Sequence, residues 1–378
     1  MPSTGSRTLG GTILRLLAGA CLLLALDAAV FRSGFYMQHV ASPDSAAGHV
    51  AQVLRQAEAV PEDTRPVLVF GDSRIGEGFS GQAATARAAE AGSGLTFFGT
   101  SSSGATPRVM YFFLRGIDPD RRRFSAVVIG LGTLHDAEPT DVWNWERDIG
   151  LIHSFLRPGD IPDLFADSDK PAFRSYALRA LLFPGTNYTT DLRRLFAEGP
   201  KRLESVRWWR EHGNNTLAAY PGIDASLEGL SYDFATERLE IPPSAEARGM
   251  AGWLRTYATD LSTVHRYGTT DNPPMTAYRY KWLRRIAERY RDAGVPVYLV
   301  QLPRGPLHGM MPPPGEPTGA VKRLVDEGLV RLLPPALAAG LERPELFADP
   351  LHLNRIGRIA FSRVLADGMI GAAQVAAR

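Results

Sequence analysis

Short apolar runs that alternate with amphipathic stretches are the feature that most constrains the fold of this chain. Four such runs, each rich in β-branched or aromatic residues, occur at 66–70, 95–98, 124–131 and 295–302. A short run that is apolar throughout is typical of a parallel strand buried on both faces. Helical spacing separates these runs, so strands and helices alternate along the chain. The sequence therefore predicts an α/β fold whose parallel sheet is covered by helices on both sides.

Further helices and a weaker fifth strand complete this pattern. We expect the fifth strand at 330–333 and helices at 46–58, 83–91, 107–114, 277–293, 319–327 and 356–369. The alternation lapses between residues 137 and 272, where helical stretches, turns and most of the tryptophans occur. Three parts follow from this pattern: an N-terminal segment 1–31, a connector 32–62 that carries a helix, and a domain 63–378 with a mainly helical insertion at 137–272.

The composition is that of an ordinary globular protein, and it narrows the classes of function. Hydrophobic residues make up 44% and charged residues 22% of the 378 positions, enough for a packed core. A formal net charge of +2 argues against a nucleic-acid binder, and the basic run 121–123 reads as a solvated turn. The single cysteine, Cys21, excludes an internal disulfide and a cysteine-based metal site. No P-loop, complete dinucleotide fingerprint or metal-ligand spacing occurs, so we expect neither a cofactor nor a metal.

The N-terminus carries a targeting signal. Arg7 and Arg15 precede the apolar run 16–26, which is followed by Asp27 and the short apolar stretch 28–31. A membrane span needs about 20 apolar residues and the core of a signal peptide about 7–15, so this segment lies between the two. Basic residues ahead of it favour a cytoplasmic N-terminus. We expect an uncleaved signal anchor; the alternatives are a cleaved signal peptide and a buried helix of a cytosolic protein.

A serine follows the first predicted strand directly, in the sequence Gly71-Asp72-Ser73-Arg74. Ligands of parallel sheets bind at the carboxyl ends of the strands, so this serine is well placed for nucleophilic chemistry. A serine hydroxyl is a weak nucleophile until a neighbouring base removes its proton. The same four residues also make ordinary turns and helix caps, so the motif alone leaves both interpretations open.

Near the other end of the chain, Asp349 and His352 stand three residues apart, just before the last predicted helix. Across a turn stiffened by Pro350, the carboxylate can face imidazole Nδ1 and leave Nε2 to face a serine. This is the arrangement of an orienting acid, a base and a nucleophile. A capping aspartate and a surface histidine are the alternative interpretation.

A glycine-containing loop, residues 99–107, follows the second predicted strand. Gly104 lies close to the start of the next helix, where backbone N–H groups can face an oxyanion. The alternative is a flexible loop that needs glycine only for its turn.

Together, Gly71-Asp72-Ser73, Gly104 and the Asp349–His352 segment resemble the SGNH/GDSL hydrolase superfamily over residues 66–134 and 275–370. The resemblance implies a three-layer α/β/α, flavodoxin-like sheet. It also implies Ser73 as nucleophile, His352 as general base and then acid, Asp349 as its orienting partner, and the backbone N–H groups of Ser73 and Gly104 as oxyanion donors.

One stretch departs from the superfamily pattern, which places an asparagine side chain after the third strand as a further oxyanion donor. Residues 130–136 contain no asparagine. Thr133 or His135 could replace that donor, or the oxyanion hole has two donors only. We also consider His135 a substrate contact, against the alternative of a cap at the strand end. Arg74 could bind an anionic substrate through its planar guanidinium group, or face solvent.

The anchor, the large insertion and the loose motif spacing are similar to envelope proteins that O-acetylate or D-alanylate exopolysaccharides and teichoic acids. We therefore expect a membrane-anchored serine esterase or O-acyltransferase that forms an acyl-Ser73 intermediate. Its expected location is the bacterial cell envelope, with the catalytic domain in the periplasm or outside; secretion after cleavage is the alternative. The expected partners are an acyl ester or polysaccharide substrate, the membrane and other polysaccharide-modification proteins. The rival hypotheses are a non-catalytic scaffold or polysaccharide-binding protein with a degenerate SGNH fold, and a cytosolic lipase-like hydrolase.

Overall fold

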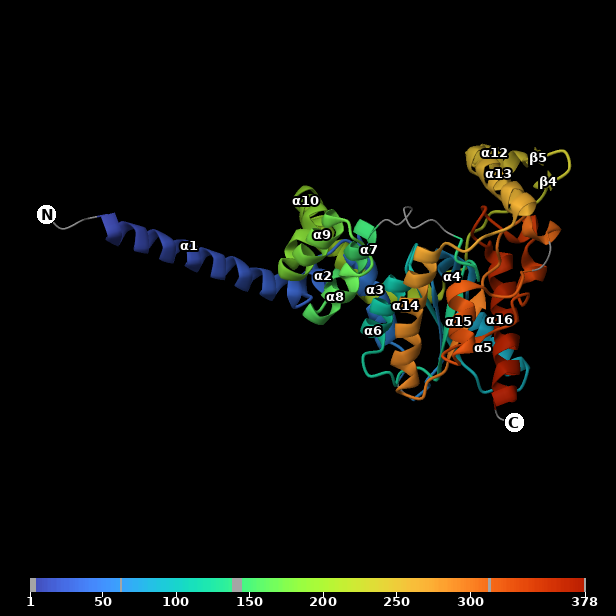
Figure 1. Ribbon diagram of the computed structural model, residues 1–378, viewed down its shortest axis with the longest axis horizontal. Helices are drawn as coiled ribbons and strands as arrows, with labels where there is room; N and C mark the ends of the chain where they lie inside the picture. The colour runs from blue at the N-terminus through green and yellow to red at the C-terminus, as the bar shows by residue number, and fades with distance from the viewer. Residues whose placement is uncertain (1–4, 62, 138–144, 312–313, 377–378) are drawn as a thin grey trace. The chain divides into compact units, whose positions relative to one another are not determined.

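The computed structural model, drawn as a ribbon in Figure 1, describes residues 5–61, 63–137, 145–311 and 314–376. The chain forms two compact units. Unit 1 contains Met1–Arg55 and Asn144–Asn215, and unit 2 contains Gln56–Trp143 and Thr216–Arg378. Half of the expected insertion therefore joins the N-terminal segment rather than the domain that follows it in sequence. The first residues of that insertion, 138–144, lie outside the described residues.

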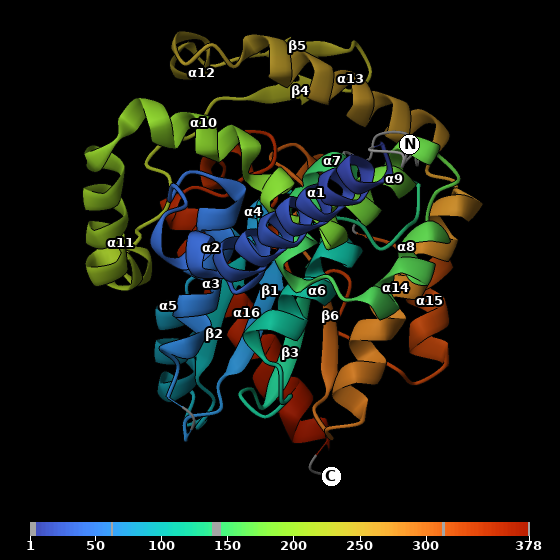
Figure 2. The ribbon, with the colours of Figure 1, turned by 90° about the vertical axis from the view of Figure 1, so that its left-hand side faces the viewer.

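Unit 2 is built on a parallel sheet of five strands, as expected. The strands are β1 (Val67–Gly71), β2 (Phe97–Ser101), β3 (Ala126–Leu131), β6 (Val297–Gln301) and β7 (Arg331–Leu332). They are ordered β2-β1-β3-β6-β7, and every neighbouring pair is parallel. Figure 2 shows the first four of them edge to edge. The order of the strands reverses between β1 and β3, which is the point where doubly wound sheets of this kind bind ligands.

Helices cover both faces of this sheet. On one face lie α5 (Gly81–Glu90) and α16 (Arg355–Ala376), which pack against each other. On the other lie α6 (Pro107–Ile117), α14 (Pro273–Arg291) and α15 (Gly319–Asp326). Strand β1 contacts both layers because its side chains alternate: Val69 joins the core beside α16, and the Phe70 ring lies 6.0 Å from the ring of Phe113 in α6.

The predicted element boundaries are accurate where the signal is local. Helix α6 begins where expected, with Pro107 in its first position and the Thr106 hydroxyl accepting a hydrogen bond from the Val109 N–H. The predicted strand 95–98 begins two residues and ends three residues too early: β2 runs from Phe97 to Ser101, paired with β1 in a register that places Val67 opposite Phe97. The fifth strand is confirmed as a two-residue edge strand.

The second half of the expected insertion, which belongs to unit 2, contains a β-hairpin as well as helices. Strands β4 (Ser231–Asp233) and β5 (Arg238–Glu240) are antiparallel and precede α12 (Pro243–Ala247) and α13 (Ala251–Tyr267). Leu254 of α13 is buried in the same core as strand β6. The second half of the insertion therefore packs into the hydrophobic core of unit 2, together with the sheet.

Unit 1 contains the N-terminal helices and a helical bundle. Helix α1 (Gly5–Asp27) continues into the π-helical turn η1 (Ala28–Arg32), followed by α2 (Phe35–His39) and by α3 (Ala46–Glu58), which matches the predicted helix. The bundle consists of α7 (Trp145–Ile152), α8 (Ile161–Phe165), α9 (Pro171–Leu182), α10 (Thr189–Glu198) and α11 (Pro200–Ala218).

A buried polar network explains why the two sequence segments of unit 1 fold together. The Tyr36 hydroxyl of α2 donates to Asp191 of α10 at 2.8 Å, and Asp191 also forms an ion pair with Arg202 of α11 at 2.9 Å. The carboxylate thus satisfies two buried donors that come from distant parts of the chain.

The N-terminal apolar helix is long enough to cross a membrane. Residues Gly11–Arg32 form a helical stretch of 22 residues with a mean hydropathy of 2.1, and no residue of its apolar 18-residue window is buried. At 1.5 Å per residue it extends about 33 Å, compared with about 30 Å for a hydrocarbon core. Length and composition fit a signal anchor or a signal peptide.

Candidate active site

Ser73 is the first residue of α4 (Ser73–Gly78), at the carboxyl end of β1. The preceding residue, Asp72, caps this helix by accepting a hydrogen bond from the Arg74 N–H at 2.9 Å. A Cβ atom on Gly71 would lie 2.6 Å from Ile75 Cγ1, so glycine is needed for α4 to fold back closely on the strand. The local sequence therefore places the serine hydroxyl at the edge of the sheet.

The Asp349–His352 turn holds its own two side chains in place. Asp349 Oδ1 accepts hydrogen bonds from the backbone N–H groups of Leu351 and His352, both at 2.8 Å. Its Oδ2 lies 2.8 Å from His352 Nδ1. A carboxylate accepts hydrogen bonds only, so Nδ1 carries the proton and Nε2 presents a lone pair.

His352 Nε2 lies 2.8 Å from Ser73 Oγ, although 279 positions separate the two residues in sequence. The predicted proximity of these side chains is confirmed. The hydroxyl can donate to the ring nitrogen, and the ring in turn donates to Asp349. This chain of two hydrogen bonds has the order nucleophile, base, orienting acid that activates a serine.

The charges around the imidazole stabilise its protonated form. The hydrogen bond with Asp349 raises the pKa of His352; burial opposes this rise, and the negative charges of Glu77 and Asp72 add to it. Burial alone would raise the pKa of Asp349, but hydrogen bonds from His352 and Leu351 lower it overall. Asp349 is therefore ionised at neutral pH and favours a proton on the imidazole ring.

The turn that carries the base is supported by residues 216–272 of the insertion. Arg248 Nη1 donates to the carbonyl oxygen of Ala348 at 2.8 Å, directly before Asp349. On the other side, Arg355 N–H donates to the Ile223 carbonyl oxygen at 2.9 Å. These contacts hold both ends of the turn, and neither was indicated by a local sequence signal.

Helix α16 connects the base to the nucleophile helix. Asn354 caps α16 by accepting from the N–H groups of Ile356 and Gly357, both at 3.0 Å. Further along α16, Arg358 Nη1 donates to the carbonyl oxygens of Gly76 and Glu77 at 2.6 and 2.9 Å. The helix that begins just after His352 is thus bound to the helix that begins at Ser73.

Glu77 is a residue of this site that sequence reasoning missed. It lies four positions after Ser73 on α4, a spacing that places the two on the same helix face and could have revealed it. Its carboxylate accepts a hydrogen bond from the Tyr220 hydroxyl and contributes to the raised pKa of His352. Tyr220 lies in the insertion, where no motif marks it.

Two backbone N–H groups in the segments that follow β1 and β2, those of Ser73 and Gly104, are free to act as donors. Ser102 N–H donates to the Gly71 carbonyl oxygen at 3.1 Å, which places the loop after β2 beside the end of β1. Gly104 in this loop has φ of +60°, a conformation that favours glycine. Within the described ranges, neither the Ser73 nor the Gly104 N–H has a hydrogen-bond acceptor.

The polar residues after β3 are engaged with one another. The Thr133 hydroxyl accepts from the His135 N–H at 3.0 Å and donates to the His135 carbonyl oxygen at 3.3 Å. The His135 ring lies with Nδ1 2.9 Å from the Thr318 hydroxyl. Leu134, between them, is fully buried. No contact places Thr133 or His135 against Ser73, and their oxyanion and substrate roles stay predictions.

Asp136 holds this loop in place through a buried ion pair. Its Oδ1 lies 2.5 Å from Arg279 Nη1 of α14, and the Asp136 side chain is 0% exposed. Arg279 also donates to the carbonyl oxygens of Thr133 and His135, at 2.8 and 2.6 Å. Arg279 thus holds the backbone of the loop in place and also balances the negative charge of Asp136.

Arg74 directs its guanidinium group at Asp72 rather than into solvent. Nε and Nη2 lie 3.0 and 2.5 Å from Asp72 Oδ2. The group also lies against Gly132, where a Cβ atom would come within 1.9 Å of Arg74 Nη1. The proposed contact between Arg74 and an anionic substrate stays a prediction.

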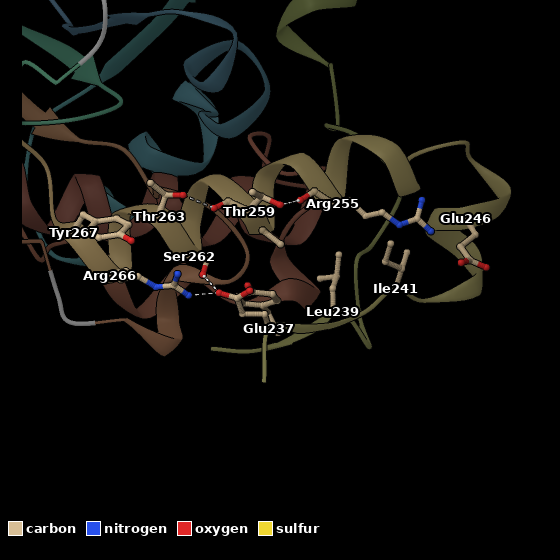
Figure 3. A pocket seen from close by; sticks show the side chains of 12 residues that line it. Glu237, Leu239, Ile241, Glu246, Arg255, Thr259, Ser262, Thr263, Arg266 and Tyr267 are labelled. Carbon is tan, nitrogen blue, oxygen red and sulfur yellow. Dashed lines mark hydrogen bonds and ion pairs between the residues drawn. The ribbon is translucent and has the colours of Figure 1, made fainter. Parts of the chain in front are cut away.

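A polar cavity of about 590 Å³ lies away from the triad, between α13 and the β4–β5 hairpin. Figure 3 shows Arg255, Arg266 and Tyr267 around it, together with Glu237, which accepts hydrogen bonds from Ser262 and Arg266. None of Ser73, Asp349 and His352 lines this cavity. In the described part of the chain, no three His, Cys, Asp or Glu side chains gather as metal ligands.

No family model matches this chain, and no curated protein matches its sequence. Its resemblance to SGNH hydrolases therefore rests on the motifs themselves.

Proposed function

We propose that this chain is a serine acyl-ester enzyme with an SGNH-type active site. The observation that carries the proposal is the hydrogen-bonded series Ser73, His352 and Asp349, with both links at 2.8 Å. The strand order β2-β1-β3-β6-β7 also supports it, because flavodoxin-like sheets have this order and bind ligands where the serine lies.

In the first half-reaction, His352 Nε2 removes the Ser73 proton as Oγ attacks the acyl carbon. The tetrahedral intermediate collapses when the imidazolium donates its proton to the leaving alkoxide, and the acyl group remains on Ser73. In the second half-reaction His352 deprotonates water or a sugar hydroxyl, which attacks the acyl carbon and releases Ser73. Asp349 keeps the imidazole in the tautomer that both steps need.

The oxyanion of each intermediate would be stabilised by the backbone N–H groups of Ser73 and Gly104. A single such donor contributes about 10²–10³ in rate, so a hole with two donors is a workable catalyst. The Thr133 hydroxyl already has a local acceptor, which favours two donors over three.

The N-terminal helix supports a location at the membrane. We place the protein in the bacterial cell envelope, anchored in the inner membrane by Gly11–Arg32, with the catalytic unit in the periplasm or outside. An acyl ester or an acylated envelope polysaccharide would then be the substrate, and other polysaccharide-modification proteins would be natural partners. If the helix were cleaved as a signal peptide, the enzyme would be secreted instead.

The test is turnover of 4-nitrophenyl acetate by the full chain in detergent, with and without envelope polysaccharide. Release of nitrophenol that is faster with polysaccharide, together with acetylated polymer, identifies a transferase; release that does not respond identifies an esterase. A Ser73→Ala variant should lose turnover and fluorophosphonate labelling. Full turnover by that variant would refute the proposal.

The second candidate is a polysaccharide-binding scaffold that has kept the fold without the chemistry. The polar cavity beside α13 favours it, because its arginine, threonine and tyrosine side chains offer the hydrogen bonds that sugars need. The absent asparagine after β3 points the same way. Polysaccharide binding by a chain that fluorophosphonate does not label would select this candidate over the enzyme.

A further inference from the structure

The outer end of the N-terminal helix is folded into unit 1. Asp27 Oδ1 accepts a hydrogen bond from the Gly185 N–H at 2.8 Å, and Arg32 Nη2 donates to the Leu181 carbonyl oxygen at 2.7 Å. The Phe31 ring stacks on the ring of Tyr188 with centroids 5.2 Å apart. The end of α9 and the turn η5 (Pro184–Tyr188) are therefore held against residues 27–32.

This contact is too close to be incidental. A Cβ atom on Gly185 would lie 2.7 Å from Asp27 Oδ1 and 2.8 Å from the Phe31 ring, so only glycine fits there. Removal of residues 27–32 by a signal peptidase would leave the Gly185 N–H and the Tyr188 ring without these partners. The structure thus favours a retained anchor.

Asp27 marks the level of the membrane surface. A charged side chain is costly in the hydrocarbon core, and Asp27 is the first acidic residue after the apolar run, so the hydrocarbon layer ends near it. Of the 22-residue stretch Gly11–Arg32, residues 11–26 then extend about 24 Å through the core, and residues 28–32 lie in the headgroup region. Arg32 follows within about 8 Å along the helix, at the depth of the lipid headgroups. Because residues 181–185 bind Asp27 and Arg32 directly, they lie at the same depth.

Four large apolar side chains around this exit point are exposed. Leu178 and Leu182 lie one turn apart on α9, Phe183 follows directly, and Phe35 begins α2 three residues after Arg32. Their exposed fractions are 38%, 54%, 46% and 53% respectively. We call these four residues the apolar rim. Exposed apolar side chains gathered beside one structural feature mark an interaction surface.

We propose that the apolar rim inserts into the outer headgroup region of the bilayer that the anchor crosses. The proposal rests on the anchor part of the proposed function. Exposed Arg179, between Leu178 and Leu182, would then meet lipid phosphates, as basic residues beside inserted apolar ones do. Unit 1 would then contact the membrane twice, through the helix that crosses the bilayer and through the apolar rim at its surface. Together the two contacts would fix the orientation of unit 1.

The experiment measures the depth of single labels in the full chain reconstituted into vesicles. Cys21→Ser removes the only native thiol, and Leu182→Cys or Phe183→Cys then accepts a fluorophore. The matched control is Asp169→Cys, a fully exposed position before the other end of α9. The vesicles contain either unlabelled lipid or lipid with a nitroxide on its headgroup.

We expect headgroup nitroxide to quench the labels at 182 and 183 about twofold or more, and the label at 169 much less. Equal quenching at all three positions, in vesicles that carry the protein on flotation, would overturn the rim proposal and leave the anchor intact. Failure of the chain to float with vesicles would overturn both. Circular dichroism of each labelled variant confirms that unit 1 is folded.

Discussion

Two loops at the edge of the sheet carry the same two residue types and use them differently. In the turn before α16, Asp349 and His352 are three residues apart, and the carboxylate can accept from the backbone and from the ring at once. After β3, His135 and Asp136 are adjacent and do not bind each other: the His135 ring contacts Thr318, and the Asp136 carboxylate binds Arg279. The spacing of the two residues and their binding partners, rather than the residue types, therefore decide which aspartate–histidine pair can activate a nucleophile.

The largest difference between the loops should appear in turnover. We expect His352→Ala to lower kcat/KM by about 10³–10⁴ or more, because no base remains to activate Ser73. His135→Ala, the matched change in the other loop, should lower it by less than about tenfold. Steady-state kinetics with 4-nitrophenyl acetate measures both. A comparable loss of kcat/KM in the two variants would contradict this expectation and would show that His135 also takes part in the reaction.

The second difference should appear in stability. Arg279→Met leaves Asp136 charged and buried without its partner, which costs about 3–5 kcal/mol in the free energy of unfolding. Urea unfolding followed by fluorescence measures this loss. Replacing Asp136 as well, by Leu, should recover part of it, since the uncompensated charge is gone. A single variant as stable as the parent chain would show that the ion pair does not hold the loop.

A smaller effect concerns pH. The pKa of His352 is raised, first by its hydrogen bond with Asp349 and also by the charge of Glu77. Only the neutral imidazole acts as base, so kcat/KM should rise with pH through a midpoint above the ordinary value of 6.5. Glu77→Gln should move this midpoint to lower pH. Glu90→Gln, on the neighbouring helix α5, is the control that should leave the pH profile unchanged.

The smallest expected effect is that of Thr133→Val. If the oxyanion hole has two backbone donors, removing this hydroxyl should change kcat by no more than about threefold. A loss of about 10²–10³ would instead make Thr133 the third donor in place of the missing asparagine. Comparing kcat with KM decides this, because an oxyanion donor acts in the transition state and leaves substrate binding nearly unchanged.

The sheet and the triad could be predicted from sequence because their signals are local. The apolar run before Gly71 predicts a strand, and the polar residues that follow must then lie at its carboxyl end. The Asp349–His352 spacing is likewise contained in four residues. Parallel strands bring their carboxyl ends to one edge, which places Ser73 there. That His352 meets Ser73 was predicted from the resemblance to SGNH hydrolases, which joins the two motifs.

The surroundings of the triad could not be predicted, since they depend on contacts between distant residues. Arg248 and Tyr220 lie in a region with no motif, and only the folded chain brings them to Ala348 and Glu77. The division of the insertion between two units is of the same kind, because the Asp191 network joins segments about 150 residues apart. Asp72 and Arg74 are two positions apart in the sequence, but nothing in the sequence indicated that the Arg74 guanidinium group would bind the Asp72 carboxylate.

The proposed nucleophile, Ser73, lies near the start of the chain, and the proposed base, His352, lies 279 positions later, near its end. In the proposed anchored enzyme, a polypeptide that is still being exported, with its N-terminus retained in the cytoplasm, has an ordinary alcohol at position 73. Reactivity begins only when α16 docks on α4 and completes the longest-range contact of the site. If Ser73 is the proposed nucleophile, it is therefore unreactive while the chain is synthesised and exported, and it stays unreactive in a chain truncated before residue 352.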